Sequence, residues 1–318
     1  MGEFELIQKH FLPLACSVSN GALLLGPGDD CAIQRIPAGR DLVFSIDTMV
    51  EGIHFPESYP PEYLGWRVLA AAASDLAAMG AEPACFTLAL TLPEADDHWL
   101  TGFARGLADA SHTFRLALAG GDTTRGPLSL SVQVHGTVAE GRGLKRSGAR
   151  PGDLICVSGT LGDAGAALDY LEEAQPTEDM AQLLERYHHP RPRLELGESL
   201  VGLATSAIDI SDGLMADLEH ILEASEVGAT IDPALIPLSP ALSRLKGAHA
   251  VDYALNAGDD YELCVTIPEA LWQGASDAIR NQMTVIGTVN QDAGLYIKDS
   301  PGLTDRPGAG FDHFRSKA

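Results

Sequence analysis

Basic residues are scarce in this chain. Its 318 residues include 21 lysines and arginines against 44 aspartates and glutamates, which gives a formal net charge of −23. Such an excess of negative charge repels both a nucleic-acid backbone and an anionic lipid surface. We therefore expect no nucleic acid and no membrane among its partners. A phosphorylated ligand would need divalent cations or a local basic cluster to offset the repulsion.

Cysteine is also rare. The five cysteines are scattered and form no CxxC pair, so the sequence predicts neither a zinc site nor a disulfide framework. Cys156 and Cys264 lie in apolar strand-like runs, which is typical of small core residues. A reducing compartment, and by default the cytoplasm, is the expected location.

Long apolar runs and the common nucleotide motifs are missing as well. The richest apolar stretch, residues 69–92, is interrupted by two acids and a proline, and the first residues lack the pattern of a secretory signal. There is no GxxxxGK[ST] and no GxGxxG motif, so a nucleotide would be held through metals and backbone. The absence of GxSxG weakens the case for acyl transfer.

Apolar segments of strand and helix type follow one another along the chain and predict two α/β domains, each with its own core. In the first domain we expect a mixed sheet with two long helices, at residues 61–79 and 95–114. The Gly-rich segment 140–152 predicts the junction between a domain at 1–139 and a domain at 140–318.

The same junction holds the only dense basic cluster of the sequence. Its members are Arg142, Lys145, Arg146 and Arg150. A solvated hinge is one interpretation of this cluster. Contact with an anion is the other, because the rest of the chain is so acidic.

Aspartates recur where apolar strands meet glycine-containing turns: they are Asp30, Asp47, Asp122, Asp209 and Asp212. We expect Asp47 at the carboxyl end of a strand that covers residues 43–46, and Asp122 just after a strand at 116–119. Strand ends are where α/β proteins gather polar chemistry, although an aspartate there can simply start a turn. Ser211 is expected to cap the helix that begins at Asp212.

Asp75 stands out because it lies in a helix that is otherwise almost entirely apolar. Between residues 68 and 79 the only other polar residue is Ser74. A helix that is apolar all round is buried, and a carboxylate inside it must be protonated or matched to a cation. Together with the strand-end aspartates, Asp75 predicts an all-oxygen magnesium platform and hence a polyphosphate ligand.

Eight motifs follow one another from the first tenth of the chain to its end: GPGDDCA, FSIDTMVEGIHF, SDLAAMGAEP, GGDTTRGPLS, LKRSGARPGD, AIDISDGLMADL, GDDYEL and GFDHF. In this order they resemble the motifs of the thiamine-monophosphate kinase family. The resemblance implies the two-domain fold shared with aminoimidazole ribonucleotide synthetase, in which the first domains of two chains pair as a barrel in a homodimer. It also implies magnesium-dependent transfer of the γ-phosphoryl group of ATP to thiamine monophosphate, by direct in-line displacement.

The resemblance further implies the site residues. The magnesium ligands would be Asp30, Ser45, Asp47, Asp75, Asp122, Asp209 and Asp212, and among them Asp30, Asp47, Asp75 and Asp122 would carry catalysis. The ATP contacts would be Gly121, Asp122, Arg146 and Ser211. The thiamine phosphate pocket would be lined by His54, Asp259 and Phe311. Family members usually have Glu at the position of Asp259, and Tyr or Trp at the position of Phe311.

Several alternatives stay open at this point. The chain could be another ATP-using enzyme of the same superfamily, making aminoimidazole ribonucleotide or selenophosphate, although GDDYEL and GFDHF favour the thiamine branch. A metal-dependent phosphohydrolase and a non-catalytic metal-binding protein also use clustered acids. For His54, a phosphohistidine intermediate is the alternative to a substrate contact.

Overall fold

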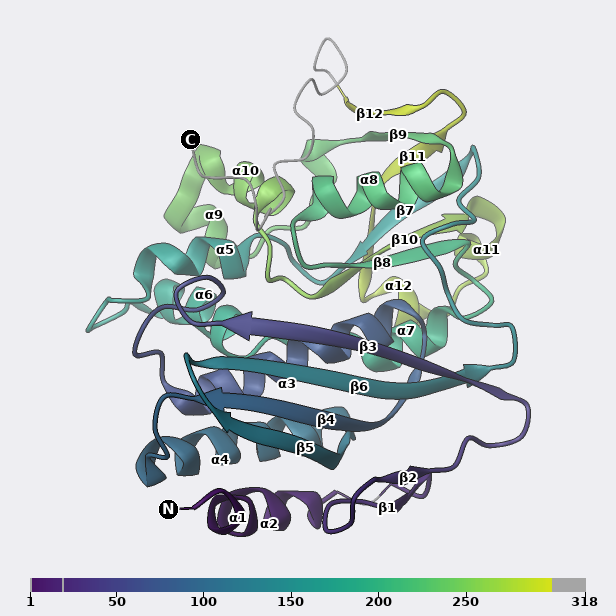
Figure 1. Ribbon diagram of the computed structural model, residues 1–318. Coiled ribbons are helices and arrows are strands. Elements are labelled where there is room, and N and C mark those ends of the chain that lie inside the picture. The colour runs from purple at the N-terminus through teal and green to yellow at the C-terminus, as the bar shows by residue number, and fades with distance from the viewer. Residues whose placement is uncertain (1, 19, 299–318) are drawn as a thin grey trace. The chain divides into compact units, whose positions relative to one another are not determined.

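The computed structural model describes residues 2–18 and 20–298, and its chain divides into two compact units (Figure 1). The first unit comprises the chain up to Leu76 together with Gly80–Gly143. The second comprises Ala77–Met79 and the chain from Leu144 onward.

The first unit is built on a four-stranded sheet with the strand order β3-β6-β4-β5. All neighbours in it are antiparallel except β4 and β5, which are parallel. The two long helices α3 and α4 lie on one face of this sheet (Figure 1). The elements are β3 (Arg40–Val50), α3 (Pro61–Ala78), β4 (Glu82–Leu92), α4 (Asp97–Phe114), β5 (Ala117–Arg125) and β6 (Ser129–Ala139).

A short N-terminal segment precedes the sheet. It consists of α1 (Glu3–Leu6), the π-helix η1 (Ile7–Phe11), α2 (Leu12–Ala15) and the antiparallel pair β1 (Leu23–Leu25) and β2 (Ile33–Gln34). Leu23 packs against a small buried cluster formed by Cys85, Ala117 and Ala119. The segment therefore rests against strands β4 and β5.

Helix α3 is buried as the sequence predicts. Its residues from Val68 to Ala78 are all buried except Asp75, which is half-buried. The helix packs closely on α4 at two glycines: a Cβ on Gly65 would lie 2.3 Å from the carbonyl oxygen of Phe103, and a Cβ on Gly106 would lie 1.8 Å from that of Glu62. The small side chains let the two backbones touch, and this contact fixes α3 beneath the sheet.

Two strands of the first unit are longer than the sequence indicated. Strand β3 continues to Val50, so Asp47 lies inside the ladder opposite Val132 and not at a strand end. Strand β5 continues through Asp122 to Arg125, paired with β4. The prediction that both strands end at their aspartates was wrong. The backbone groups of the polar residues after each apolar run form hydrogen bonds with a neighbouring strand, so each strand continues.

The second unit contains, within its described residues, a six-stranded sheet with the order β12-β9-β11-β7-β10-β8. Its pairs are antiparallel except β12 with β9, which is parallel. Cys156 and Cys264 lie inside this sheet with buried side chains and free thiols, as expected. The strands are β7 (Asp153–Ser158), β8 (Ser206–Ile210), β9 (Gly228–Ile231), β10 (Glu262–Pro268), β11 (Met283–Asn290) and β12 (Gly294–Ile297).

The helices of the second unit are α5 (Asp163–Ala167), α6 (Glu178–His188), α7 (Leu194–Leu200), α8 (Leu214–Ser225), α9 (Pro240–Lys246), α10 (Ala250–Asn256), α11 (Glu269–Gln273) and α12 (Asp277–Arg280), with 3-10 turns at Leu168–Tyr170, Pro233–Leu235 and Gly247–His249. Helices α11 and α12 are separate because Gly274 is the C-cap of α11 and Ser276 caps the start of α12. Each unit combines a sheet with helices, as predicted, and the mixed, largely antiparallel sheets make the fold α+β. Among the described residues, none of the helices is long and apolar enough to cross a membrane.

Candidate active site

Two carboxylates and a hydroxyl converge between β3 and α3 in the first unit. Ser45 and Asp47 are two residues apart on β3, so both side chains lie on its half-buried side. There Ser45 Oγ donates a hydrogen bond to Asp75 Oδ2 at 2.5 Å. Burial, and next the charge of Asp75, raise the pKa of Asp47 to about 6. The two acids therefore lie close enough to repel each other, which is the kind of repulsion that a bound cation relieves.

These side chains fit the chemistry of magnesium. All three donors are oxygen, the ligand type that this ion prefers, and the ion keeps waters and so needs few protein ligands. Among the described residues, however, nowhere do three or more histidine, cysteine, aspartate or glutamate side chains come together as a group able to hold a metal ion. Asp47 and Asp75 would thus supply only part of a magnesium site, and further oxygen ligands would have to complete it.

Asp122 does not join this pair within one chain. Asp47, Val132, Leu88 and Gly121 form one row of paired residues across the sheet from β3 to β5. Three strand spacings of about 4.8 Å put roughly 14 Å between the backbones of Asp47 and Gly121. The two predicted groups therefore lie on opposite edges of the same sheet.

Gly121 is required where it lies. A Cβ at this position would approach the carbonyl oxygen of Leu88 to 2.0 Å, so only glycine lets β5 pair with β4 here. Asp122 is exposed beside it. Asp30 is also exposed, in the turn after β1, and its backbone amide donates to the side chain of Asp29.

His54 lies in the turn that follows β3. The backbone amide of Val50 donates to its Nδ1 at 3.0 Å, so Nδ1 is an acceptor and the proton of the neutral ring is on Nε2. The ring is half-buried. Its Nε2–H is suited to donate to an anionic oxygen, and the occupied Nδ1 is not suited to act as a nucleophile.

In the second unit, Asp209, Ser211 and Asp212 lie at the junction of β8 and α8. Asp209 is buried and paired with Leu263, whereas Ser211 and Asp212 are half-buried in the loop that follows. The expectation that Ser211 caps the helix was wrong. Helix α8 begins at Leu214, and its N-cap is Gly213, which makes no side-chain capping bond.

The amides of this loop are bound instead by an acid inside the helix, which sequence reasoning missed. Oδ2 of Asp217 accepts hydrogen bonds from the backbone N–H groups of Ser211, Asp212 and Gly213 at 3.0, 3.1 and 3.1 Å. Burial and then the charge of Asp212 raise the pKa of Asp217 to about 7, although the three amides act in the opposite direction.

The loop that carries Asp259 is joined to the Ser211 loop by backbone contacts. The amide of Asp259 donates to the carbonyl oxygen of Ser211 at 2.9 Å, and that of Tyr261 donates to Ile210 at 2.8 Å. Gly258 allows this approach, because a Cβ there would lie 2.2 Å from the Ser211 oxygen. Asp259 itself has φ 66°, and its Oδ1 accepts from the hydroxyl of Tyr261.

Arg146 is exposed in the basic segment before β7, and its backbone is held from helix α8. Ser225 Oγ donates to the carbonyl oxygen of Arg146 and accepts from the amides of Gly148 and Ala149. Ser225 is the last residue of α8, whereas Ser211 precedes the first. A helix of this length spans about 18 Å, so the long side chain of Arg146 would have to reach back toward the Ser211 loop.

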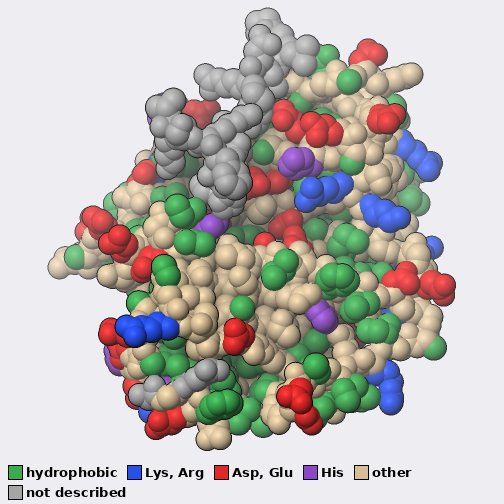
Figure 2. Space-filling view, in the orientation of Figure 1, with side chains coloured by type: hydrophobic (Ala, Val, Ile, Leu, Met, Phe, Trp, Pro, Cys, Tyr) green, Lys and Arg blue, Asp and Glu red, His purple; other side chains and the backbone are tan. Residues whose placement is uncertain are grey.

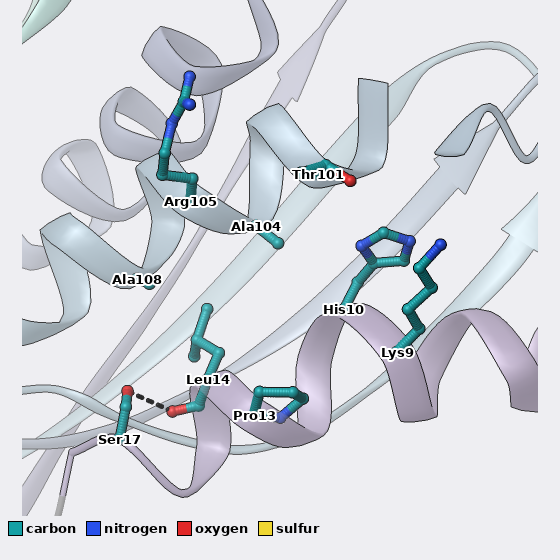
Figure 3. A pocket seen from close by; sticks show the side chains of 9 residues that line it. All are labelled: Lys9, His10, Pro13, Leu14, Ser17, Thr101, Ala104, Arg105 and Ala108. Carbon is teal, nitrogen blue, oxygen red and sulfur yellow. Dashed lines mark hydrogen bonds between the residues drawn. The ribbon is translucent and has the colours of Figure 1, made fainter. Parts of the chain in front are cut away.

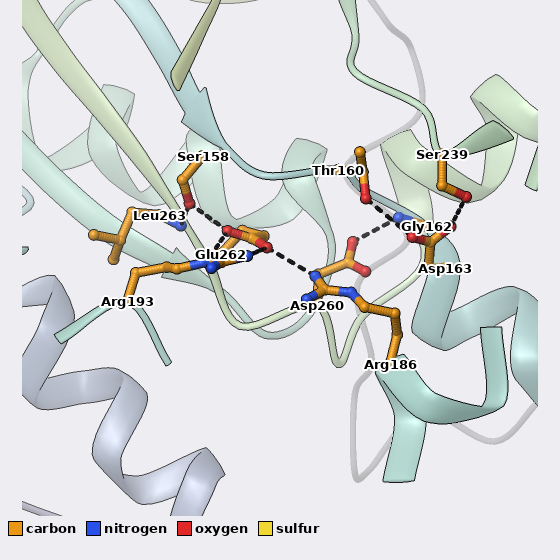
Figure 4. Close-up of polar contacts among 10 residues, drawn as sticks. All are labelled: Ser158, Thr160, Gly162, Asp163, Arg186, Arg193, Ser239, Asp260, Glu262 and Leu263. Atoms are coloured by element: carbon orange, nitrogen blue, oxygen red, sulfur yellow. Dashed lines mark hydrogen bonds and ion pairs between the residues drawn. The ribbon is translucent and has the colours of Figure 1, made fainter. Parts of the chain in front are cut away.

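A buried ion-pair cluster is centred on Glu262, the first residue of β10, and was also missed from the sequence (Figure 4). Glu262 has no exposed side-chain surface and accepts hydrogen bonds from Arg186, Arg193 and Ser158. Burial alone would raise the pKa of Glu262, but Arg193 and then Arg186 outweigh it and the pKa is lowered. Burial raises the pKa of Asp260 well above its usual value, although its Oδ2 accepts from the amide of Gly162 at 2.7 Å.

A cavity of about 330 Å³ lies elsewhere, between the N-terminal helices and α4 (Figure 3). Its basic residues Lys9 and His10 both contact Asp97, and Arg105 pairs with Glu62. No residue of the predicted site lines it. Phe311 lies outside the described residues.

Two models of known protein families match this chain. The family model described as AIR synthase related protein, N-terminal domain, matches residues 28–138, and the corresponding C-terminal domain model matches residues 150–300. The chain is therefore a two-domain protein of the AIR synthase related class.

Known proteins that align with nearly the whole chain identify a family within this class. The chain is 46% identical to thiamine-monophosphate kinase of Escherichia coli K12 over 98% of both chains. It is 40% identical to the crystal structure of thiamine-monophosphate kinase from Stenotrophomonas maltophilia K279a, with a TM-score of 0.86 and coverage of 93% of this chain and 97% of that one. A structure of AaThiL complexed with AMPPCP and TMP has 31% identity, a TM-score of 0.80 and coverage of 88% and 89%. The chain belongs to the thiamine-monophosphate kinase family.

Proposed function

We propose that this protein uses ATP to phosphorylate thiamine monophosphate to thiamine diphosphate, with ADP as the second product. The observation that carries the proposal is the similarity over 98% of the chain to a thiamine-monophosphate kinase. The related AaThiL complexed with AMPPCP and TMP supports the pairing of a nucleotide with this acceptor. The superfamily alternatives and the phosphohydrolase have no comparable support.

In this proposal, the magnesium ligands of the first unit are Ser45, Asp47 and Asp75 together with Asp30 and Asp122, and those of the second unit are Asp209 and Asp212. Magnesium bound there would supply positive charge that offsets the negative charge of the phosphate oxygens. The Ser45 hydroxyl already bonds to Asp75 and orients that carboxylate. Asp47 is spaced along β3 so that it shares the same side as Ser45.

ATP is proposed to contact Gly121, Asp122, Arg146 and Ser211. Thiamine monophosphate is proposed to contact His54, Asp259 and Phe311. His54 can donate from Nε2 to a phosphate oxygen, since its Nδ1 accepts from the backbone. Asp259 is joined through its backbone to the Ser211 loop, and this link would keep an acceptor contact at a fixed distance from a nucleotide contact.

The transfer itself is proposed to be direct and in line. The acceptor is a phosphate group that is ionised at neutral pH, so no strong general base is needed, and positioning and charge neutralisation supply the rate. His54 then acts as a donor to the substrate, not as a nucleophile. Acid-labile phosphate on the protein after incubation with ATP would contradict this assignment.

We also propose that the protein is a cytoplasmic homodimer in which the first domain, residues 1–139, dimerises and binds ATP and magnesium, and residues 140–318 complete the sites. Leu42, Phe44 and Ile46 are exposed on the open side of β3, an edge strand of the sheet. Figure 2 shows hydrophobic side chains on this face. A second sheet paired edge to edge as a barrel would cover them and leave no free edge.

Such a barrel also offers a way to complete the magnesium site. Asp47 and Asp122 occupy opposite edges of one sheet, on β3 and β5. If β3 of one copy lies beside β5 of the other, the strands that carry Asp47 and Asp122 become neighbours. Asp122 is in register with Thr48 and so lies on the opposite face from Asp47. The proposed site would then be shared between two chains at the seam where these strands meet.

The decisive assay is incubation with ATP, magnesium and thiamine monophosphate. We expect thiamine diphosphate and ADP to form in a one-to-one ratio. Free phosphate without thiamine diphosphate would identify a phosphohydrolase, and no ATP turnover would leave a non-catalytic metal-binding protein. The same incubation with selenide or with the precursor of aminoimidazole ribonucleotide tests the superfamily alternatives.

A further inference from the structure

Asp217 makes an unusual set of contacts for a side chain in the first turn of a helix. It is 2% exposed, and one of its carboxylate oxygens accepts from three consecutive backbone amides, those of Ser211, Asp212 and Gly213. These residues lie between β8, which ends at Ile210, and α8, which begins at Leu214. The amides therefore lie outside the ladders of both elements, and the carboxylate is what binds them.

The loop has little freedom apart from this contact. Gly213 has φ 116°, a conformation that favours glycine, and a Cβ there would lie 2.8 Å from the backbone of Asn256. On its other side, the carbonyl oxygen of Ser211 accepts from the amide of Asp259. Asp217 thus sets the direction of the three N–H groups, while the Asp259 loop donates a hydrogen bond to the Ser211 carbonyl oxygen.

We propose that Asp217 is a positioning residue for the phosphoryl transfer, which by gathering these three amides orients the side chains of Ser211 and Asp212 toward the nucleotide and its metal. This inference rests on the proposed function of that loop. Asp217 itself is directed into the protein and acts on the substrate only through the loop. A purely structural carboxylate would stabilise the fold without changing how nucleotide is bound.

The test compares the wild-type protein with Asp217→Asn and with Glu223→Gln. Glu223 is an exposed acid of the same helix, so its variant makes the matched change from acid to amide without touching the loop. Hydrogen exchange at residues 211–213 and steady-state kinetics for each substrate are measured. The amide of asparagine is a weaker acceptor than a carboxylate, so we expect faster exchange at these three residues only in Asp217→Asn.

The kinetic result should follow the exchange result. Because misplaced contacts reduce rates steeply, we expect kcat/KM for ATP in Asp217→Asn to fall on the order of 100-fold with a largely retained melting temperature. Glu223→Gln should behave like wild type. Unchanged ATP kinetics in a folded Asp217→Asn, or an equal loss in both variants, would overturn the proposal.

A second measurement keeps the inference testable should Asp217→Asn fail to fold. In the wild-type protein, the amides of residues 211–213 should exchange slowly although they belong to no helix or strand. Rapid exchange there would overturn the role of Asp217. Neither exchange measurement requires turnover. A wild-type protein that fails to phosphorylate thiamine monophosphate would therefore contradict the proposed function, whereas the exchange rates would still decide whether Asp217 holds the loop.

Discussion

The backbone amide of Asp259 donates a hydrogen bond to the carbonyl oxygen of Ser211 at 2.9 Å. This bond joins a loop proposed to contact the acceptor to a loop proposed to contact ATP. It uses no side-chain atom of either residue. Side-chain changes at Asp259 can therefore be made without breaking the link to Ser211.

Replacing Asp259 by asparagine should weaken the binding of thiamine monophosphate without weakening that of ATP. Asparagine tolerates the positive φ of this position and keeps the shape, but it loses the charge proposed to face the acceptor. We expect KM for thiamine monophosphate to rise about tenfold, as when a hydrogen bond to a charged group is lost, while KM for ATP stays near wild type. Tyr261→Phe, which removes only the hydroxyl that donates to Asp259, is the matched control. An equal rise in both KM values would contradict the assignment.

Replacing Asp47 by asparagine should abolish turnover without harming the fold. Asp47 and Asp75 repel each other in the folded protein, so removing one charge relieves repulsion and should leave the melting temperature unchanged or higher. Loss of a metal ligand should lower kcat on the order of 100-fold or more. Asp109→Asn, an exposed change on α4, controls for net charge. Near-normal activity of Asp47→Asn at low magnesium would rule out the platform.

Mixing two inactive variants tests whether the site is shared between chains. Asp47→Asn and Asp122→Asn should each be inactive as homodimers. In a mixed dimer, a site built from both chains would pair the intact Asp47 of one copy with the intact Asp122 of the other, so one of the two sites would be wild type. We expect activity to return after subunit exchange. A mixture that exchanges subunits but stays inactive would mean that each chain builds its own site.

The sequence predicts single elements better than the contacts between them. The burial of the helix around Asp75 could be predicted because the neighbours of Asp75 in α3 are nearly all apolar, which is a property of one helix. The place of Asp47 could not, because Thr48 to Val50 extend the strand only where β6 supplies partners. The expected cap at Ser211 failed for the same reason: Asp217 lies four residues past the N-cap and reaches back.

The cluster at Glu262 was out of reach of sequence reasoning. Its arginine partners lie 69 and 76 residues away in the chain, and neither is near a recognisable motif. Spacing rules describe neighbours within an element, whereas these contacts depend on how strands and helices are packed. The family resemblance supplied candidate site residues but not the contacts that hold them.

Glu262→Gln should destabilise the second unit strongly. The change leaves two arginines facing a neutral group in a buried place, which lowers the free energy of unfolding by about 3–5 kcal/mol. Arg244→Gln, which breaks the exposed pair with Asp179, is the matched control and should change the midpoint of urea unfolding little. Similar losses in the two variants would show that burial does not distinguish the pairs.

The stability contributed by Asp260 should depend on pH. Burial raises the pKa of Asp260 well above its value of 3.8 in an unfolded chain. The protonated form is therefore favoured in the folded state, so its contribution is complete below pH 3.8 and is lost as the pH rises through the native pKa. Asp260→Asn stays neutral and keeps an oxygen that can accept from the amide of Gly162. We expect its stability relative to wild type to increase as the pH is raised from 4.

An acid with the opposite shift provides the control for this measurement. A hydrogen bond from Lys298 lowers the pKa of Asp232, so the contribution of Asp232 is present above pH 3.8 and is lost as the pH falls. Asp232→Asn should therefore lose stability relative to wild type as the pH rises, opposite to Asp260→Asn. Urea unfolding of the three proteins at several pH values measures both slopes. A slope for Asp260→Asn that is flat or of the same sign as that of Asp232→Asn would mean that Asp260 is ionised in the folded protein.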